Sequence, residues 1–160
     1  MHTNIVPAPQ SAAPGAVAVE YCEPSRRACL TAILRMTGLR PTRQRLDLAN
    51  RLIGCDRHVT AEDLYFEATA NGQEMSLATV YNTLRQFQAC GLVRELAVDG
   101  MSSLFDTDTS RHHHFYLSEE GRILDIPADS LAVSSLPGLP EGYEVSRVEV
   151  VVRLRRKAAD

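Results

Sequence analysis

Apolar residues recur at helical spacing through the first half of the chain. The segment from Ser25 to Thr37 carries Cys29, Ile33 and Met36 at intervals close to one helical turn, and Gly38 follows as a possible C-cap. This pattern predicts a first helix that ends just before Gly38.

Two more helices are predicted downstream. The first opens at Pro41, a residue suited to a first helical turn, and its apolar face is formed by Leu46, Ala49, Leu52 and Ile53. The next begins at Thr60, which forms a capping-box-like pair with Asp63, and runs toward Asn71 and Gly72.

A fourth helix and a hairpin follow. Ser76 is a good N-cap, the helix ends at Gly91, and its apolar stripe consists of Leu77, Val80, Leu84 and Phe87. Residues 92–98 and 101–106 then predict two strands joined by a type I′ turn at Asp99-Gly100. Helices followed at once by a hairpin are the order of a winged helix-turn-helix domain.

The second half is shorter and richer in strands. The pattern predicts strands at His112–Leu117 and Ile123–Ile126, a short helix near Ala128–Ser135, and a closing strand at Val148–Leu154. About 50 residues are too few for an independent core, so we expect this sheet to pair with that of a second subunit. The expected fold is α+β, with a disordered Pro/Ala-rich arm (1–24), a winged-helix DNA-binding domain (25–107) and a small α/β dimerisation and ligand-sensing domain (108–160).

Charge divides the chain in the same way. The formal net charge is −3, but residues 25–94 carry ten Lys/Arg against six Asp/Glu, whereas residues 95–152 carry three against eleven. A basic half joined to an acidic half favours a DNA-binding domain followed by a domain with another role. The sequence has no targeting signal and no apolar run of about 18 residues, so we expect a cytoplasmic protein without membrane contact.

The four cysteines give little chemistry. They are Cys22, Cys29, Cys55 and Cys90, and none forms a Cys-x-x-Cys pair. Cys90 fits a small buried apolar residue, and the Cys55-x-x-His58 spacing alone is a weak sign of a ligand pair. No structural four-cysteine zinc site is expected.

The fourth predicted helix could enter a DNA major groove. Its outward face presents Ala78, Thr79, Asn82 and Arg85, with the Tyr81 hydroxyl at the margin. Thr79 and Ala78 can touch a thymine methyl and Asn82 can pair with adenine, while the free N–H groups of the first turn favour a phosphate. An ordinary amphipathic helix satisfies the same periodicity.

Three consecutive histidines are the chemical centre of the second half. On a strand, His112 and His114 point to one face, about 7 Å apart, and His113 points to the other. Two imidazoles on one face can converge on a metal ion with help from elsewhere. An exposed polar run and a metal-dependent hydrolase using Asp106 or Asp125 are alternatives. No nucleophile elbow or separate general-base motif accompanies the histidines, so we do not expect an enzyme.

Three motifs resemble the ferric uptake regulator superfamily. They are residues 38–45, residues 58–65, and a recognition-helix pattern at Ser76, Ala78, Thr79, Val80, Tyr81, Leu84, Gly91, Leu92 and Val93. The resemblance covers roughly residues 28–155 and implies a homodimeric transcription regulator that binds double-stranded DNA. A near-palindromic, A·T-rich operator is expected. The implied DNA-binding residues are Arg43, Arg45, Ser76, Ala78, Thr79, Tyr81, Asn82 and Arg85, with Tyr81 and Asn82 on bases and Arg45 on phosphate.

The same resemblance implies a regulatory metal site between the two domains. The positions that match it are His58, Asp106, His112, His114 and Asp125, and all suit iron, manganese or zinc. The structural zinc cysteines of the superfamily would lie where Leu117 and Glu120 stand.

The histidine run also resembles the iron response regulator branch of the superfamily, which implies heme binding by His112, His113 and His114 and control of iron and heme metabolism genes. The alternative is a regulator that responds to a divalent metal or to peroxide. Because axial ligands lie on opposite sides of a porphyrin, only one of these histidines could be axial without large distortion. The second ligand would have to come from His58, another protomer or a rearranged chain.

Overall fold

The computed structural model describes residues 25–70, 72, 74–96 and 103–157. The elements follow in the order α1 (Arg26–Met36), α2 (Arg43–Leu52), β1 (His58–Thr60), α3 (Ala61–Ala70), α4 (Leu77–Ala89), β2 (Arg94–Leu96), β3 (Leu104–Asp106), β4 (His112–Leu117), β5 (Arg122–Pro127), the short 3₁₀ helix η2 (Ala128–Ser130) and β6 (Val151–Leu154). The predicted arm 1–24 and the Asp99-Gly100 turn lie outside the described residues.

Side-chain caps fix where the helices begin. The Ser76 hydroxyl accepts a hydrogen bond from the Thr79 N–H at the start of α4. Before α3, the Asp63 N–H donates to the Thr60 hydroxyl and the Thr60 N–H donates to the Asp63 carboxylate, which confirms the predicted capping pair. Thr42 caps α2, so Pro41 lies just outside this helix rather than in its first turn.

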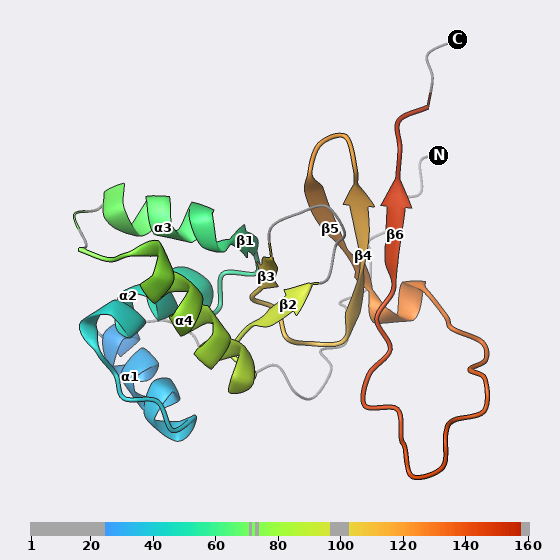
Figure 1. The fold of residues 1–160 in the computed structure, drawn as a ribbon, viewed down its shortest axis with the longest axis horizontal. Coiled ribbons are helices and arrows are strands. Elements are labelled where there is room, and N and C mark those ends of the chain that lie inside the picture. Colours follow the sequence, from blue (N-terminus) through green and yellow to red (C-terminus); the bar gives the residue numbers. More distant parts are fainter. Residues whose placement is uncertain (1–24, 71, 73, 97–102, 158–160) are drawn as a thin grey trace, which may run out of the picture.

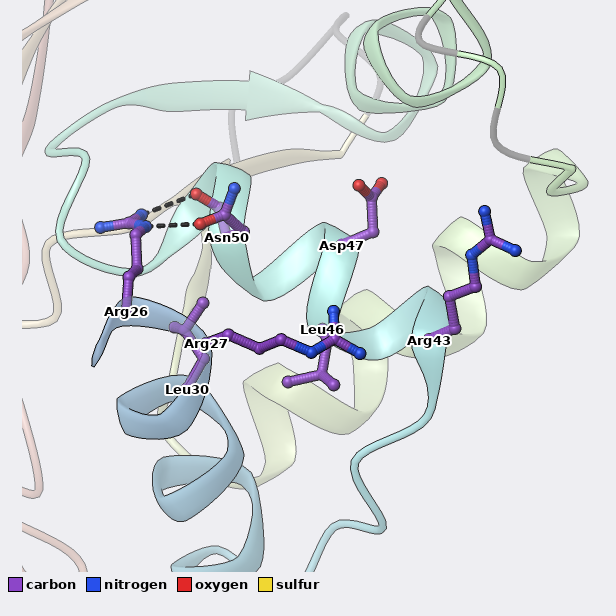
Figure 2. Close-up of a pocket in the computed structure, with 7 residues that line it drawn as sticks. All are labelled: Arg26, Arg27, Leu30, Arg43, Leu46, Asp47 and Asn50. Atoms are coloured by element: carbon purple, nitrogen blue, oxygen red, sulfur yellow. Dashed lines mark hydrogen bonds between the residues drawn. The ribbon is translucent and has the colours of Figure 1, made fainter. Parts of the chain in front are cut away.

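Helix α1 packs on α2 with a different face from the one that the apolar spacing indicated. Leu30 and Leu34 are buried, whereas Met36 is 86% exposed. At the far end of the contact, the Arg26 guanidinium donates to the Asn50 carbonyl at 2.7 Å (Figure 2). The helix ends as predicted, because Gly38 adopts φ +78°, a conformation that favours glycine.

The four helices enclose the larger core together with a small sheet. Its strand order is β1-β3-β2, with both neighbouring pairs antiparallel. The fully buried side chains of this core include Leu48, Leu52, Leu64, Val80, Leu84 and Phe87. A helical cluster closed by a two-stranded hairpin and one extra strand is a winged-helix arrangement.

A second three-stranded sheet lies beside the first and has the order β5-β4-β6 (Figure 1). Strand β4 runs antiparallel to β5 and parallel to β6. A smaller apolar cluster of Leu96, Leu104, Tyr116 and Ile123 joins the two sheets. The hairpin of the winged helix is therefore in direct contact with the His-rich strand.

The region after β5 contains less regular structure than the sequence indicated. The helix predicted near Ala128–Ser135 is only the 3₁₀ turn η2, and the closing strand begins at Val151 rather than Val148. In Figure 1 this region is a long open loop between η2 and β6. Among the described residues, no helix is long and apolar enough to cross a membrane.

Candidate metal centre and nucleic-acid face

The strand register brings the five predicted metal ligands to one place. His58 on β1 lies opposite Asp106 on β3, and His114 on β4 lies opposite Asp125 on β5. Residues directly opposite each other on antiparallel strands share one face of the sheet. His112 lies two residues before His114 on the same strand, so its side chain is on the same face of the sheet.

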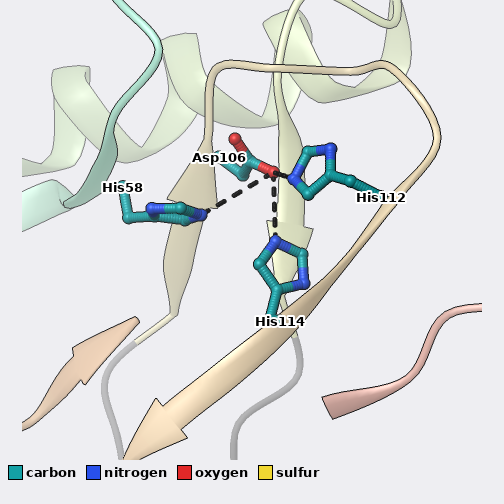
Figure 3. A group of neighbouring side chains, drawn as sticks. All are labelled: His58, Asp106, His112 and His114. Carbon is teal, nitrogen blue, oxygen red and sulfur yellow. Dashed lines mark ion pairs between the residues drawn. The ribbon is translucent and has the colours of Figure 1, made fainter. Parts of the chain in front are cut away.

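The ligand atoms point toward a common centre. Figure 3 shows the imidazoles of His58, His112 and His114 around one oxygen of Asp106. The Nε2 atoms of His112, His114 and His58 lie 3.0, 3.5 and 3.9 Å from Asp106 Oδ2. One ligand atom from each of these four residues lies within 4.8 Å of every other. Asp125 Oδ1 adds a fifth donor, 3.1 Å from His58 Nε2.

The distances from Asp106 Oδ2 to the three imidazole nitrogens fit a first-row divalent ion. Donors held at roughly 2.0–2.2 Å from one ion lie about 3–4 Å apart from one another. Three imidazole nitrogens and two carboxylates also match the nitrogen and oxygen preference of iron, manganese and zinc. A further sign is that His58 Nε2 is buried and, although it lies close to Asp125 Oδ1, makes no hydrogen bond of good geometry in the described part of the chain. The residues present therefore fit a metal ion.

Burial and hydrogen bonding favour the metal-binding protonation states of His58 and Asp106. Burial lowers the pKa of His58, although Asp106 and Asp125 act in the opposite direction. Burial alone would raise the pKa of the Asp106 carboxyl, which is only 1% exposed. Hydrogen bonds that include those of His114 and Arg94 outweigh burial and lower that pKa to about 2. A neutral imidazole and an ionised carboxylate are the forms that bind metal.

Arg94 is a member of this cluster that the sequence did not indicate. It lies on β2 opposite Asp106, and its Nε donates to Asp106 Oδ2 at 2.7 Å. Its Nη2 contacts Asp106 Oδ2 and His112 Nε2 and lies 3.4 Å from His114 Nε2. The hairpin register could have revealed it, since Arg94 and Asp106 are paired across the wing.

His113 points away from this cluster, as strand alternation predicts. Its Nδ1 accepts a hydrogen bond from the Val150 N–H at 3.3 Å. The groove on this side has a volume of about 190 Å³ and includes Leu131, Val133 and Leu136 in its lining. Pockets that hold drug-sized ligands have volumes of about 300–1,000 Å³, and heme is at least as large as such a ligand. Because His113 and His114 face different places and the groove that His112 and His113 line is small, the residues do not fit heme.

The described cysteines take no part in the metal cluster. Cys29, Cys55 and Cys90 are free thiols. Cys55 Sγ lies 3.9 Å from an Arg26 nitrogen, and the cluster that contains His58 does not include it. Cys90 is half-buried rather than fully buried, and its thiol donates to the Thr37 carbonyl.

Helix α4 presents the polar face that the sequence indicated. Ser76, Ala78, Asn82 and Arg85 are exposed, and Thr79 and Tyr81 are half-buried. Thr79, Asn82 and Arg45 line one groove of about 230 Å³ between α4 and the start of α2. The Tyr81 hydroxyl donates to Glu62 on α3 at 2.8 Å. An exposed amide beside a guanidinium suits recognition of a base edge and of a neighbouring phosphate.

The two arginines of α2 that were predicted to bind DNA differ in their surroundings. Arg45 is half-buried, and its guanidinium donates to Gln86 on α4 and to the Arg40 carbonyl. Arg43 is exposed and lines a separate groove of about 400 Å³ with Arg26 and Arg27 (Figure 2). The structure therefore places Arg45 beside Asn82 but gathers Arg43 with the arginines of α1.

A winged helix joined to a site that can hold a divalent ion defines a class of protein, the metal-responsive transcription regulators. Residues 36–152 match the ferric uptake regulator family, and the chain belongs to that family. Its members are dimeric DNA-binding transcription regulators that bind divalent metals, not enzymes. The fold is accordingly α+β, with an N-terminal winged-helix DNA-binding domain and a C-terminal α/β domain.

Individual relatives agree on the family. The peroxide operon regulator of Bacillus subtilis is 39% identical over 120 residues, which cover 73% of this chain and 83% of that one. A peroxide-responsive repressor of Staphylococcus aureus is 38% identical over 94 residues, 59% of this chain and 64% of that one. The ferric uptake regulator of Pseudomonas aeruginosa with manganese is 26% identical, with a TM-score of 0.61 over 81% of this chain and 98% of that one. These matches do not support the iron response regulator branch that the histidine run indicated.

Proposed function

We propose that the chain is a DNA-binding repressor whose operator affinity depends on a divalent ion of iron, manganese or zinc. The ligands are His58, Asp106, His112, His114 and Asp125. The observation that carries this proposal is the convergence of three imidazole nitrogens and the Asp106 carboxylate on one centre. In this proposal, residues 25–107 bind the operator and residues 108–160 form the dimer and complete the metal site.

The position of the ligands explains how an ion would act on DNA binding. His58 and Asp106 belong to the sheet of the winged helix. His112, His114 and Asp125 belong to the second sheet. An ion held by both sets restricts the angle between the two sheets. In a dimer this angle sets the distance between the two recognition helices, and DNA half-sites require a fixed spacing.

Operator binding by the metal-free and metal-loaded protein tests this proposal. We expect chelated protein to bind an A·T-rich, near-palindromic duplex weakly, and Mn²⁺ or Zn²⁺ to increase the affinity by a factor of about 5–150, the usual range for coupling between two sites. Fluorescence anisotropy measures this change, and His114→Ala provides the metal-site control. Equal affinity with and without metal contradicts the proposal. If hemin alone changes the affinity, heme rather than a divalent ion is the ligand.

The named relatives favour a peroxide-responsive form of the same repressor. Peroxide can act on the site only if the bound ion has redox chemistry, which iron has and zinc lacks. We therefore expect hydrogen peroxide to release the iron-loaded protein from its operator and to leave the zinc-loaded protein bound. Gel-shift titrations with the two loaded forms measure the difference. Release of both forms indicates general oxidation, and release of neither rules out peroxide sensing.

We further infer that the chain is a homodimer through residues from about 110 to 155. The loop between η2 and β6 exposes five large apolar side chains in the single chain, namely Val133, Leu136, Leu139, Tyr143 and Val145. Such a group is typical of an interaction surface. Sedimentation should give a dimer at micromolar concentration, and replacing Leu136 and Leu139 with serine should shift the protein to monomer. A wild-type monomer at that concentration contradicts the inference.

A further inference from the structure

The Arg94 guanidinium lies where a metal ion would lie. Its Nη2 contacts or approaches three ligand atoms, Asp106 Oδ2, His112 Nε2 and His114 Nε2. The Arg94 side chain is only 11% exposed, so it is enclosed by the cluster. A guanidinium and a divalent ion cannot occupy the same small space between these atoms.

Arg94 also supplies a positive charge to the buried Asp106 carboxylate. The Asp106 carboxylate is almost fully buried, and a buried carboxylate without a cationic partner is strongly destabilising. An arginine side chain stays protonated in proteins and can donate several hydrogen bonds in one plane. Arg94 therefore supplies to the metal-free protein the positive charge that an ion supplies to the loaded one.

Arg94 has other partners at the edge of the site. Its Nη1 lies 3.2 Å from Glu149 Oε1 and donates to the Ser110 carbonyl at 3.2 Å. Glu149 lies two residues before β6, and its side chain is 30% exposed. A guanidinium that leaves the cluster therefore has a carboxylate beside it that can keep it paired.

We propose that Arg94 is an internal cation that competes with the divalent ion and so sets the metal affinity of the site. This inference rests on the proposed function, because it assumes that the cluster binds metal. Metal binding requires the Arg94 guanidinium to move out of the cluster toward Glu149. The affinity of the wild-type site is lower than its five ligands alone would give, by the free energy of separating Arg94 from Asp106 and His112.

Zn²⁺ and Mn²⁺ titrations of three proteins test the competition. Arg94→Ala should bind Zn²⁺ at least tenfold more tightly than wild type, because no side chain has to be displaced. Arg122→Met is the matched control, since Arg122 is an arginine on a strand of the second sheet that pairs with Glu120 instead of a metal ligand. It should bind like wild type. Equal or weaker binding by Arg94→Ala overturns the proposal.

Chemical rescue adds a result that a purely structural role would not produce. Guanidinium ion at millimolar concentration should enter the space left in Arg94→Ala and weaken Zn²⁺ binding toward the wild-type value. Urea, which has a similar shape but no charge, should have no effect. If urea and guanidinium act alike, or if neither changes the affinity of Arg94→Ala, the Arg94 position does not compete with metal.

A measurement on the wild-type protein covers the case in which Arg94→Ala does not fold. The Arg94 Nε–H resonance, assigned by comparison with Arg94→Lys, should be protected from exchange without metal and should shift and exchange rapidly when Zn²⁺ binds. An unchanged resonance in the zinc-loaded protein overturns the proposal. By contrast, if no protein binds Zn²⁺ and His114→Ala behaves like wild type, the proposed function itself has failed.

Discussion

His114→Ala lowers the affinity for Mn²⁺ or Zn²⁺ by about 100-fold or more. The change removes a ligand itself, and even the loss of an outer hydrogen-bond partner of a ligand costs about 10–100-fold. His114 is also fully buried, and its Nε2 lies 3.5 Å from Asp106 Oδ2. Isothermal titration calorimetry with a competing chelator measures the difference.

His113→Ala is the matched control for this change. His113 is the next residue on the same strand and is also buried, but it faces the other side and accepts a hydrogen bond from Val150. Its loss should lower thermal stability while leaving the metal affinity within about threefold of wild type, since it contacts no ligand. Equal losses of affinity in the two variants would mean that the cluster is not the metal site.

Asn82→Ala should cause a loss of operator selectivity that is about as large as the loss of metal affinity in His114→Ala. A bidentate contact to one base contributes about 1–3 kcal/mol of discrimination, and a dimer makes it twice. The expected loss is therefore about 2–6 kcal/mol, which is on the order of 30-fold to 10⁴-fold in the ratio of operator to random-DNA affinity. Competition binding measures this ratio. Gln88→Ala, an exposed change farther along α4, should leave it unaltered.

Arg45→Ala should behave differently from Asn82→Ala on the same DNA. Arg45 lines the groove with Asn82 but carries a charge suited to phosphate, so its loss should weaken binding to all sequences and flatten the salt dependence. Its hydrogen bond to Gln86 also connects α2 with α4, and its bond to the Arg40 carbonyl connects α2 with the loop before it. If Arg45→Ala changes selectivity as much as Asn82→Ala does, the two residues do not have separate roles in phosphate and base contacts.

Strand alternation made part of the arrangement of the predicted metal ligands foreseeable, because it is simple geometry. His112 and His114 had to share a face once β4 formed, and the structure confirms this. It is much harder to predict which of two stripes on α1 is buried. Leu30 and Leu34 follow a helical interval just as Ile33 and Cys29 do, and only the position of α2 decides between them.

Arg94 escaped prediction for a related reason. An arginine near the start of a predicted wing strand looks like a solvent-exposed or DNA-facing residue when only its own strand is considered. Its burial depends on Asp106 across the hairpin and on His112 from the second sheet. The length of the final strand is likewise set by its partner, since the register of β6 begins with Val151 opposite His114.

The cross-strand placement of the ligands has a consequence for how the chain folds. His58 and Asp106 meet only if β1 and β3 pair in one alignment, and His114 and Asp125 meet only if β4 and β5 do so. A slip by one residue would turn every side chain of the shifted strand to the opposite face. A complete set of donors thus exists in a single alignment of both strand pairs. An ion that binds during folding would therefore favour correct strand pairing, because it stabilises correctly aligned chains and does not stabilise misaligned ones.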